Sequence, residues 1–282
     1  MTKNSFLSLM VRNKLAVFGG VIVLSMFAVS WLAPFISPHD PNRPNVTARF
    51  RPPGTPEHLL GTDSLGRDVL SRMIWGSRVS LKVGFVAVGL STFIGLILGA
   101  LAGFHGGIVD ALIMRFCDLM LCFPSMFLIL SVIAILEPSI WNVMIVIGLT
   151  SWMGVARFVR AEFMSLKGRD FALAAKALGA SDFRIIWRHL LPNAMGPVLV
   201  TATLGVAGAI LTESSLSFLG LGVQPPTPTW GAILSEGKNY LTRAYWLSLY
   251  PGLAILLTVL SYNLLGEGLR EALNPYNDKI SS

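Results

Sequence analysis

Long apolar segments constrain the fold of this chain most, because a helix needs about 20 mostly apolar residues to cross a bilayer. Only 13% of the 282 residues are charged, whereas an ordinary soluble domain has roughly 25% charged residues. The mean hydropathy is +0.65. The chain is therefore predicted to be an all-α integral membrane protein with six transmembrane helices. These are expected at residues 15–36, 81–104, 119–136, 139–156, 193–216 and 244–265.

Several residues between and within these segments predict how the spans connect and pack. Glu137 and Pro138 separate the third and fourth segments, the two shortest, so these are expected to form a hairpin. Positive residues precede the first segment, as in a signal sequence. Its apolar run is too long, however, and no small-residue cleavage site follows, so we expect it to be retained. Gly95, Gly99 and Gly103 repeat every four residues and predict a face for close helix packing, although glycine is also simply common in membrane helices.

The positive residues predict the orientation of the spans, since cytoplasmic loops carry an excess of Lys and Arg. The formal net charge is +7, which we interpret as loop charge and not as affinity for nucleic acid. Six spans place both termini on one side, and a cytoplasmic N-terminus leaves 13 of the 22 positive residues inside. Segment 157–192 is predicted to be cytoplasmic because it alone carries seven of them: Arg157, Arg160, Lys167, Arg169, Lys176, Arg184 and Arg188.

Residues 170–192 have the pattern of a basic, amphipathic helical hairpin between the fourth and fifth spans. Gly179 suits a left-handed stop of the first helix, and Ser181 or Asp182 can cap the second, which ends where Pro192 begins the fifth span. Such a hairpin can insert into a groove on a soluble partner, or rest on anionic lipid. Its apolar face and the flanking charges comprise Phe171, Ala174, Ala175, Leu178, Arg184 and Arg188.

The sequence contains no recognisable catalytic or metal-binding constellation. Segment 231–239 resembles a phosphate loop, but it has five residues between its glycines where four are needed, and Asn239 replaces the required Ser or Thr. Cys117 and Cys122 lie five apart in an apolar stretch and predict neither a disulfide framework nor a metal site. The chain is therefore predicted to be neither an enzyme nor an ATP-binding protein. The four histidines fall in four different segments: His39, His58, His105 and His189.

Three further groups of residues are candidates for function outside the cytoplasm. Glu213 and the adjacent Ser214 lie near the outer end of the fifth span, where an acid in apolar surroundings is a candidate for the substrate path; contact with interfacial water or with Ser214 is the alternative. Asp63, Arg67, Asp68 and Arg72 are spaced for salt bridges on a short helix outside the membrane, and a solvated charged helix explains them equally well. A stiff proline-rich loop is expected to face a receptor through Gln224, Pro225, Pro226 and Trp230.

The hairpin resembles the EAA loop of permeases from ATP-binding-cassette (ABC) importers. Ala174-Ala175, Gly179 and Leu191-Pro192 fall at the spacing of that motif. Leu173 stands where the family has Glu, and His189 where it has Ile. The resemblance implies that the hairpin, including Asp182, couples the spans to a cytoplasmic ATPase.

Segments 58–72, 217–231 and 251–275 are similar to the dipeptide/oligopeptide/nickel permease family, in particular to its shorter "C"-type subunit. The resemblance implies a type I (MetI-like) importer core preceded by one extra N-terminal helix. The expected boundaries are 1–76 for that helix and an extracytoplasmic segment, 77–270 for the core and 271–282 for a cytoplasmic tail.

The resemblance also implies the setting in which the chain works. This is the bacterial inner membrane, where lipid surrounds the chain and both termini are cytoplasmic. The implied partners are a homologous permease, two ATPases that hold ATP and Mg²⁺, and an extracytoplasmic substrate-binding protein; no cofactor is implied for this chain. Peptides are the expected cargo, with nickel, metal chelates or glutathione as alternatives. A secondary transporter is the rival class, but it would place ionisable residues deep within its spans, and these spans carry almost no charge at their midpoints.

Overall fold

The computed structural model describes residues 10–11, 13–137 and 139–273. Helices account for nearly all regular structure in this part of the chain, and no strand occurs in it. Short helical turns connect the main helices at Val46–Ala48, Ile185–Leu190 and Lys238–Tyr240. The α-helices are α2 (Lys14–Ile36), α3 (Val69–His105), α4 (Gly107–Leu121), α5 (Ser125–Ile135), α6 (Ile140–Lys167), α7 (Asp170–Ala177), α8 (Asp182–Arg184), α9 (Leu191–Phe218), α10 (Trp230–Gly237) and α11 (Trp246–Leu273).

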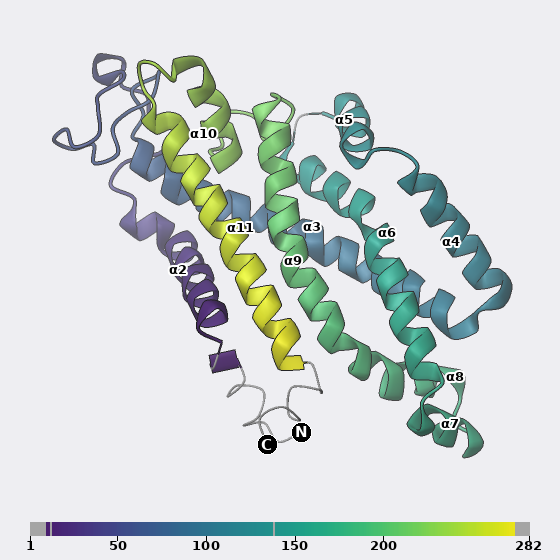
Figure 1. Ribbon diagram of the computed structural model, residues 1–282. Helices are drawn as coiled ribbons and strands as arrows, with labels where there is room; N and C mark the ends of the chain where they lie inside the picture. Colours follow the sequence, from purple (N-terminus) through teal and green to yellow (C-terminus); the bar gives the residue numbers. More distant parts are fainter. Residues whose placement is uncertain (1–9, 12, 138, 274–282) are drawn as a thin grey trace.

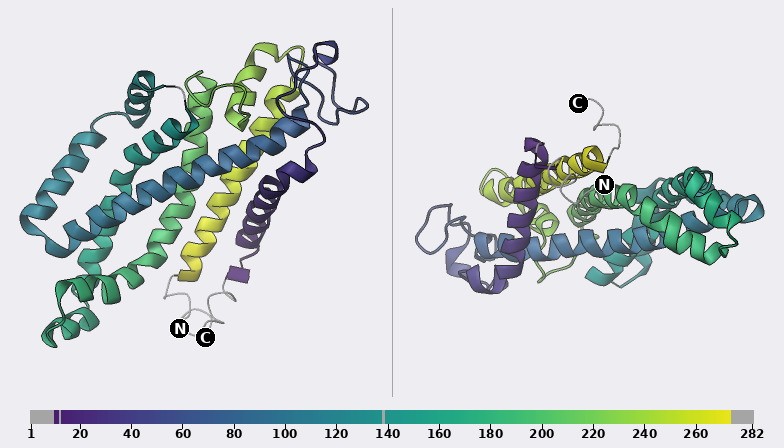
Figure 2. Two further views of the ribbon diagram at one scale, coloured as in Figure 1. Left: turned by 180° about the vertical axis from the view of Figure 1, so that it is seen from behind. Right: turned by 90° about the horizontal axis from the view of Figure 1, so that it is seen from below.

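Five helices of the described chain are long and apolar enough to cross a membrane, and the bent pair α4–α5 makes a sixth if it counts as one span. This confirms the prediction of an all-α membrane protein. The helices alternate in direction, so that the beginning of α2 and the end of α11 lie at the same end of the bundle as α7 and α8 (Figure 1). We call this the α7 end. The opposite end, which we call the α10 end, carries α10 and the long connection between α2 and α3 (Figures 1 and 2).

The third span differs from the prediction at 119–136. Its first half is α4, which begins at Gly107, and α4 and α5 are bent by 83° at a break that ends in Pro124. Proline disfavours helical geometry in the residue before it, which ends α4 here. The apolar window missed α4 because this helix carries Asp110 and Asp118, whose charges are neutralised by arginines of α6. Pro138, half of the predicted breaker, lies outside the described residues.

Other helices extend beyond the apolar windows. The second helix of the hairpin runs into the fifth span without a break, as one helix from Asp182 to Phe218. Its last part, α9, begins at Leu191, beside the predicted start at Pro192. A π-type turn at Ile185–Leu190 precedes Pro192, and the wider turn accommodates a residue that has no N–H to donate. The predicted domain boundary at residues 76/77 falls inside α3. Of the predicted tail, residues 274–282 lie outside the described residues, as do Lys3, Arg12 and Lys279 of the charge argument.

The glycine repeat of α3 packs against α6, as predicted. A Cβ atom added to Gly99 would lie 2.5 Å from the carbonyl oxygen of Ala156 and 2.8 Å from the Cβ of Val159. Cβ atoms at Gly95 and Gly103 would each lie 2.6 Å from atoms of α6. The two helices therefore approach so closely that only glycine fits at these three positions, which is the packing mode of small residues in membranes.

A buried ionic cluster organises the α10 end. Asp63 and Arg67 lie in the loop before α3, and Arg72 lies in the first turn of α3. Arg72 bonds to Asp63 (2.6 Å) and, through both Nη atoms, to Glu236 of α10 (2.6 and 2.9 Å), while Arg67 also bonds to Asp63 (2.7 Å) and Glu236 (2.8 Å). The predicted salt bridges are confirmed, but the short helix and the solvated alternative are both wrong, because Asp63 and Arg67 lie in a loop and are buried. Two arginines and two carboxylates neutralise one another in the interior, which offsets their loss of hydration.

Candidate functional site

The hairpin at the α7 end is built on a specific turn. Gly179 has φ = +78°, a left-handed conformation that only glycine adopts without strain. The N–H of Ala180 donates to the carbonyl of Ala175 (3.1 Å), and that of Gly179 to Lys176 (3.0 Å); this pair of bonds closes the helix end in a Schellman motif. The Oγ of Ser181 then accepts from the N–H of Arg184 (3.4 Å) and caps α8. The predicted glycine stop and Ser181 cap are both confirmed.

One face of α7 is buried against its own chain. Ala172 and Ala175, three residues apart, pack into a cluster with Phe104 of α3, Phe163 of α6 and Ile185 after α8. The prediction that Ala175 belongs to a partner-facing surface is therefore wrong. Ala174 and Ala175 are equally small and apolar, so residue type alone does not tell which of them faces the bundle. Ala175 instead fixes the hairpin to the spans.

The other face of α7 is exposed and continues onto α8. The exposed fractions are 37% for Phe171, 53% for Leu173 and 88% for Leu178, and 71% for Phe183 and 57% for Trp187. Ala174 and Ala177 are exposed between them. Phe183 lies on α8 and Trp187 in the Ile185–Leu190 turn after it. Apolar side chains exposed to this degree on both arms of one hairpin mark an interaction site. We call this surface the outer face; its residues are Phe171, Leu173, Ala174, Ala177, Leu178, Phe183 and Trp187.

Charged residues border the outer face. Asp182, Arg184 and Arg188 are all exposed on the second arm of the hairpin, and Arg184 and Arg188 were the two predicted to flank the apolar face. Phe183 and Trp187 were missed by the sequence prediction, although their four-residue spacing places them on one helix face. Their rings lie 5.9 Å apart, so they extend the apolar surface beyond Gly179.

A second feature is a groove of about 340 Å³ between α3, α6 and α9. Small residues and hydroxyl groups line it. A Cβ atom added to Gly154 or Gly208 would have nothing within 4 Å, so both glycines face open space. The lining residues with hydroxyl groups are Ser91, Thr92, Ser151, Thr201 and Thr212.

Glu213 and Ser214, the predicted substrate-path residues, contribute nothing to this groove. Glu213 is fully buried, and its Oε1 accepts hydrogen bonds from Ser217 (2.8 Å) and from Thr229 (2.9 Å). Thr229 is the N-cap of α10. Glu213 therefore joins the end of α9 to the start of α10 within this subunit.

The proline-rich loop keeps part of its predicted character. Gln224, Pro225 and Pro226 are exposed at the α10 end. Trp230, however, is 2% exposed and begins α10, where its Nε1 donates to the carbonyl of Met73 (3.2 Å). The prediction that Trp230 faces a receptor is therefore wrong. An aromatic residue after a proline-rich loop can either anchor the loop or recognise a partner. Trp230 anchors the loop to the bundle.

These features together define a membrane transport subunit: a bundle of spans with a hydroxyl-lined groove and an exposed apolar surface at one end. The chain belongs to the family described as the inner membrane component of binding-protein-dependent transport systems, whose model matches residues 95–278. Residues 6–53 match a second model, the N-terminal TM domain of oligopeptide transport permease C. The predicted importer core with an extra N-terminal helix is thus confirmed.

Relatives match along nearly the whole chain. A dipeptide transport system permease protein, DppC, from Haemophilus influenzae is 43% identical, covering 94% of this chain and 91% of its own. A di/tripeptide transport system permease protein from Pseudomonas aeruginosa is also 43% identical over 94% of this chain and 89% of its own. A glutathione transport system permease protein, GsiD, from Pectobacterium atrosepticum is 40% identical, with coverages of 94% and 88%. The chain is therefore a multi-pass permease subunit of an ABC importer.

Proposed function

We propose that the outer face is where a cytoplasmic ATPase docks, and that this contact drives the transport cycle. The main support for this docking is that Leu178 and its neighbours are exposed on a hairpin whose opposite face packs against the spans. An amphipathic helix that presents an apolar face to a groove is a recurrent mode of recognition. ATP and Mg²⁺ belong to the ATPases in this proposal, and the permease itself hydrolyses nothing.

The anchoring of the hairpin supports transmission of movement to the spans. Ala172, Ala175 and Ile185 are buried against α3 and α6, and α8 is continuous with α9. A displacement of α7 is therefore carried into three spans through packed side chains, not through a flexible linker. When two ATPases close around ATP, the spans of this subunit and of a homologous permease tilt, and the transport path that the two subunits enclose changes the side to which it opens.

This proposal fixes the orientation of the chain. The α7 end, with the beginning of α2 and the end of α11, lies in the cytoplasm of a bacterial cell. The α10 end lies outside, where Gln224, Pro225 and Pro226 are exposed to an extracytoplasmic substrate-binding protein.

Peptides are the proposed cargo. Two of the relatives named above are described as dipeptide or di/tripeptide permeases, and the groove offers hydroxyl groups that exchange hydrogen bonds with peptide amides. Glutathione is the second candidate, because a glutathione permease is nearly as similar. Selection among these cargoes is assigned to the substrate-binding protein.

Two matched substitutions on the outer face test ATPase docking. Leu178→Glu places a charge at the most exposed apolar position of α7. Leu173→Glu places the same charge at the position where the EAA motif has Glu. Burying a leucine side chain contributes about 1.5–3 kcal/mol, so Leu178→Glu should weaken ATPase association at least about 10-fold, whereas Leu173→Glu should be tolerated.

The measurement is co-purification of the ATPases with tagged permease, together with uptake of a labelled dipeptide by cells. Membrane level and pairing with the sister permease serve as controls for both variants. Equal ATPase recovery from wild type and Leu178→Glu would refute docking on this surface. If the wild-type complex binds the ATPases and takes up glutathione but no dipeptide, the docking proposal stands and glutathione replaces peptides as the proposed cargo.

A further inference from the structure

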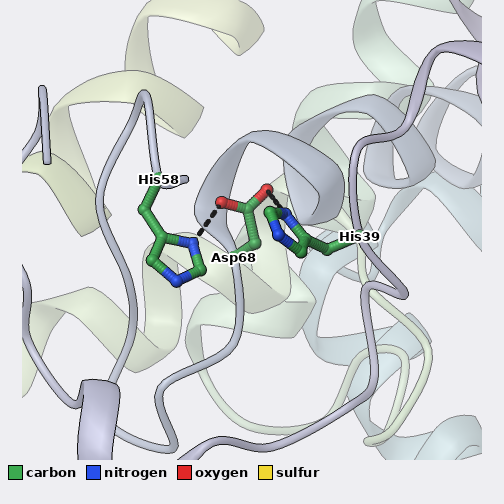
Figure 3. A group of neighbouring side chains, drawn as sticks. All are labelled: His39, His58 and Asp68. Atoms are coloured by element: carbon green, nitrogen blue, oxygen red, sulfur yellow. Dashed lines mark hydrogen bonds and ion pairs between the residues drawn. The ribbon is translucent and has the colours of Figure 1, made fainter. Parts of the chain in front are cut away.

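Two histidines and an aspartate that are far apart in sequence converge at the α10 end. Asp68 lies between the two imidazole rings (Figure 3), with its Oδ1 2.9 Å from Nδ1 of His58 and its Oδ2 3.7 Å from Nδ1 of His39. One ligand atom from each of the three residues lies within 4.8 Å of the others. We infer that His39, His58 and Asp68 form a binding site for a divalent transition-metal ion of the zinc class.

The site is held in place by the surrounding fold. Asp68 caps the N-terminus of α3, where its Oδ2 accepts from both the N–H (2.8 Å) and the Oγ (2.7 Å) of Ser71. The same Oγ accepts from the backbone N–H of His39 (3.0 Å). Hydrogen bonds that orient a ligating carboxylate are characteristic of metal sites. Here they also position the second ligand.

The donor set suits zinc and its neighbours in the first transition series. Imidazole nitrogen favours Zn²⁺, Cu²⁺ and Ni²⁺, and a set of two His and one carboxylate leaves a fourth position open for water. In a tetrahedral site with bonds of about 2.0–2.1 Å, neighbouring donor atoms lie about 3.3 Å apart. The separations of 2.9 and 3.7 Å involve the two different oxygens of Asp68, and the 2.9 Å contact is a hydrogen bond to His58. The chosen ligand atoms lie within 4.8 Å of one another, so binding an ion requires His58 to give up this hydrogen bond and the imidazole rings to rotate toward a shared centre.

An ion can reach this site from solvent. A pocket of about 580 Å³ contains all three ligands, and the side chain of His39 is 39% exposed. Asp40 and Glu57 also line the pocket, together with a single positive residue, Arg43. With neutral imidazoles, three carboxylates face one guanidinium, and this balance favours a cation.

Each ligand comes from a different segment, so a bound ion would join them. His39 follows α2, His58 lies in the long loop, and Asp68 begins α3. The ion would thus tie the N-terminal span and the loop to the core at one point. This inference depends only on these side chains and not on the proposed docking of ATPases.

Zinc binding to the complete transporter tests the site. The complex is purified with a tag that lacks histidine, stripped with a chelator and dialysed against ZnCl₂. Wild type should retain one more Zn²⁺ per copy of this chain than His39→Ala or His58→Ala, or should bind that ion at least tenfold more tightly. His105→Ala, a histidine at the opposite end of α3, is the matched control and should bind as wild type does.

A third variant separates metal binding from folding. Asp68→Asn keeps an equally good N-cap residue but removes the carboxylate charge, so it should fold normally and lose the ion. Co²⁺ added in place of Zn²⁺ should give a visible absorption spectrum of nitrogen and oxygen ligation that His39→Ala abolishes. Identical zinc content and affinity in wild type, His39→Ala and Asp68→Asn would overturn the inference, even if His58→Ala proves unstable.

Discussion

The close approach of α3 and α6 gives a sharp prediction for Gly99→Ala. The added Cβ would lie 2.5 Å from the Ala156 oxygen and 2.8 Å from the Val159 Cβ, whereas non-bonded carbon atoms prefer a separation of about 3.5–4.0 Å. The backbones must therefore move apart by about 1 Å along a contact that glycines line over two turns. The oxygen is a backbone atom in a helix, so no side chain can rotate to relieve the clash.

Overpacking of this kind costs about 1–3 kcal/mol. At roughly 2–4 °C per kcal/mol for a chain of comparable size, the melting temperature of the purified complex should fall by about 2–12 °C. Gly89→Ala is the matched control, because it lies on the same helix and a Cβ there meets nothing within 4 Å. Alanine is the better helix former by about 1 kcal/mol, so this variant should melt at the wild-type temperature or slightly above it.

The assay is thermal unfolding of the detergent-purified complex, followed by tryptophan fluorescence and by size-exclusion chromatography after heating. We expect the two alanine variants to differ in melting temperature, with only that of Gly99→Ala lower than wild type. If both variants have the same melting temperature, the glycine repeat is not a packing face, and the close approach of α6 to Gly99 contributes nothing to stability.

Three further outcomes follow from the structure. Glu236→Gln removes one of the two carboxylates that neutralise Arg67 and Arg72; breaking such a buried pair should cost about 3 kcal/mol, and an unchanged melting temperature would contradict the cluster's structural role. A cysteine at Ser181 should react in intact cells only with membrane-permeant thiol reagents and one at Thr227 also with impermeant ones, whereas the reverse pattern would invert the proposed topology. Gly208→Leu should fill the groove and abolish dipeptide uptake while leaving complex assembly intact, and normal uptake would exclude the groove as the path.

Features governed by local chemistry could be predicted from the sequence. The apolar run of α2 gave bounds within one residue of the helix Lys14–Ile36, because a continuous apolar run and a local cap, the side chain of Asn13, define this helix. Gly179 was placed correctly because a helix stop with positive φ has few other solutions. The glycine face of α3 follows from a repeat of four, which is a property of the helix itself.

Features decided by contacts between distant segments could not be predicted. Asp110 and Asp118 are tolerated on α4 because Arg160 and Arg157 of α6 pair with them. An average of hydropathy along the sequence contains no information about such a pairing. The choice between Ala174 and Ala175 for the buried face depends on where α3 and α6 lie. His39 and His58 seemed scattered because nineteen positions separate them, yet the fold brings their ring centroids to 5.1 Å.

The central claim is that the outer face is covered by an ATPase in the working transporter. Leu178 is 88% exposed in this chain, so a cysteine at that position, in a Cys122→Ser background that removes the exposed native thiol, reports directly on the contact. The rate of thiol labelling is measured in the complete complex and in the permease pair without ATPases, with Thr227→Cys at the opposite end as the reference. We predict labelling at least tenfold slower in the complete complex for Leu178→Cys and equal rates for Thr227→Cys; equal rates for Leu178→Cys would contradict the account.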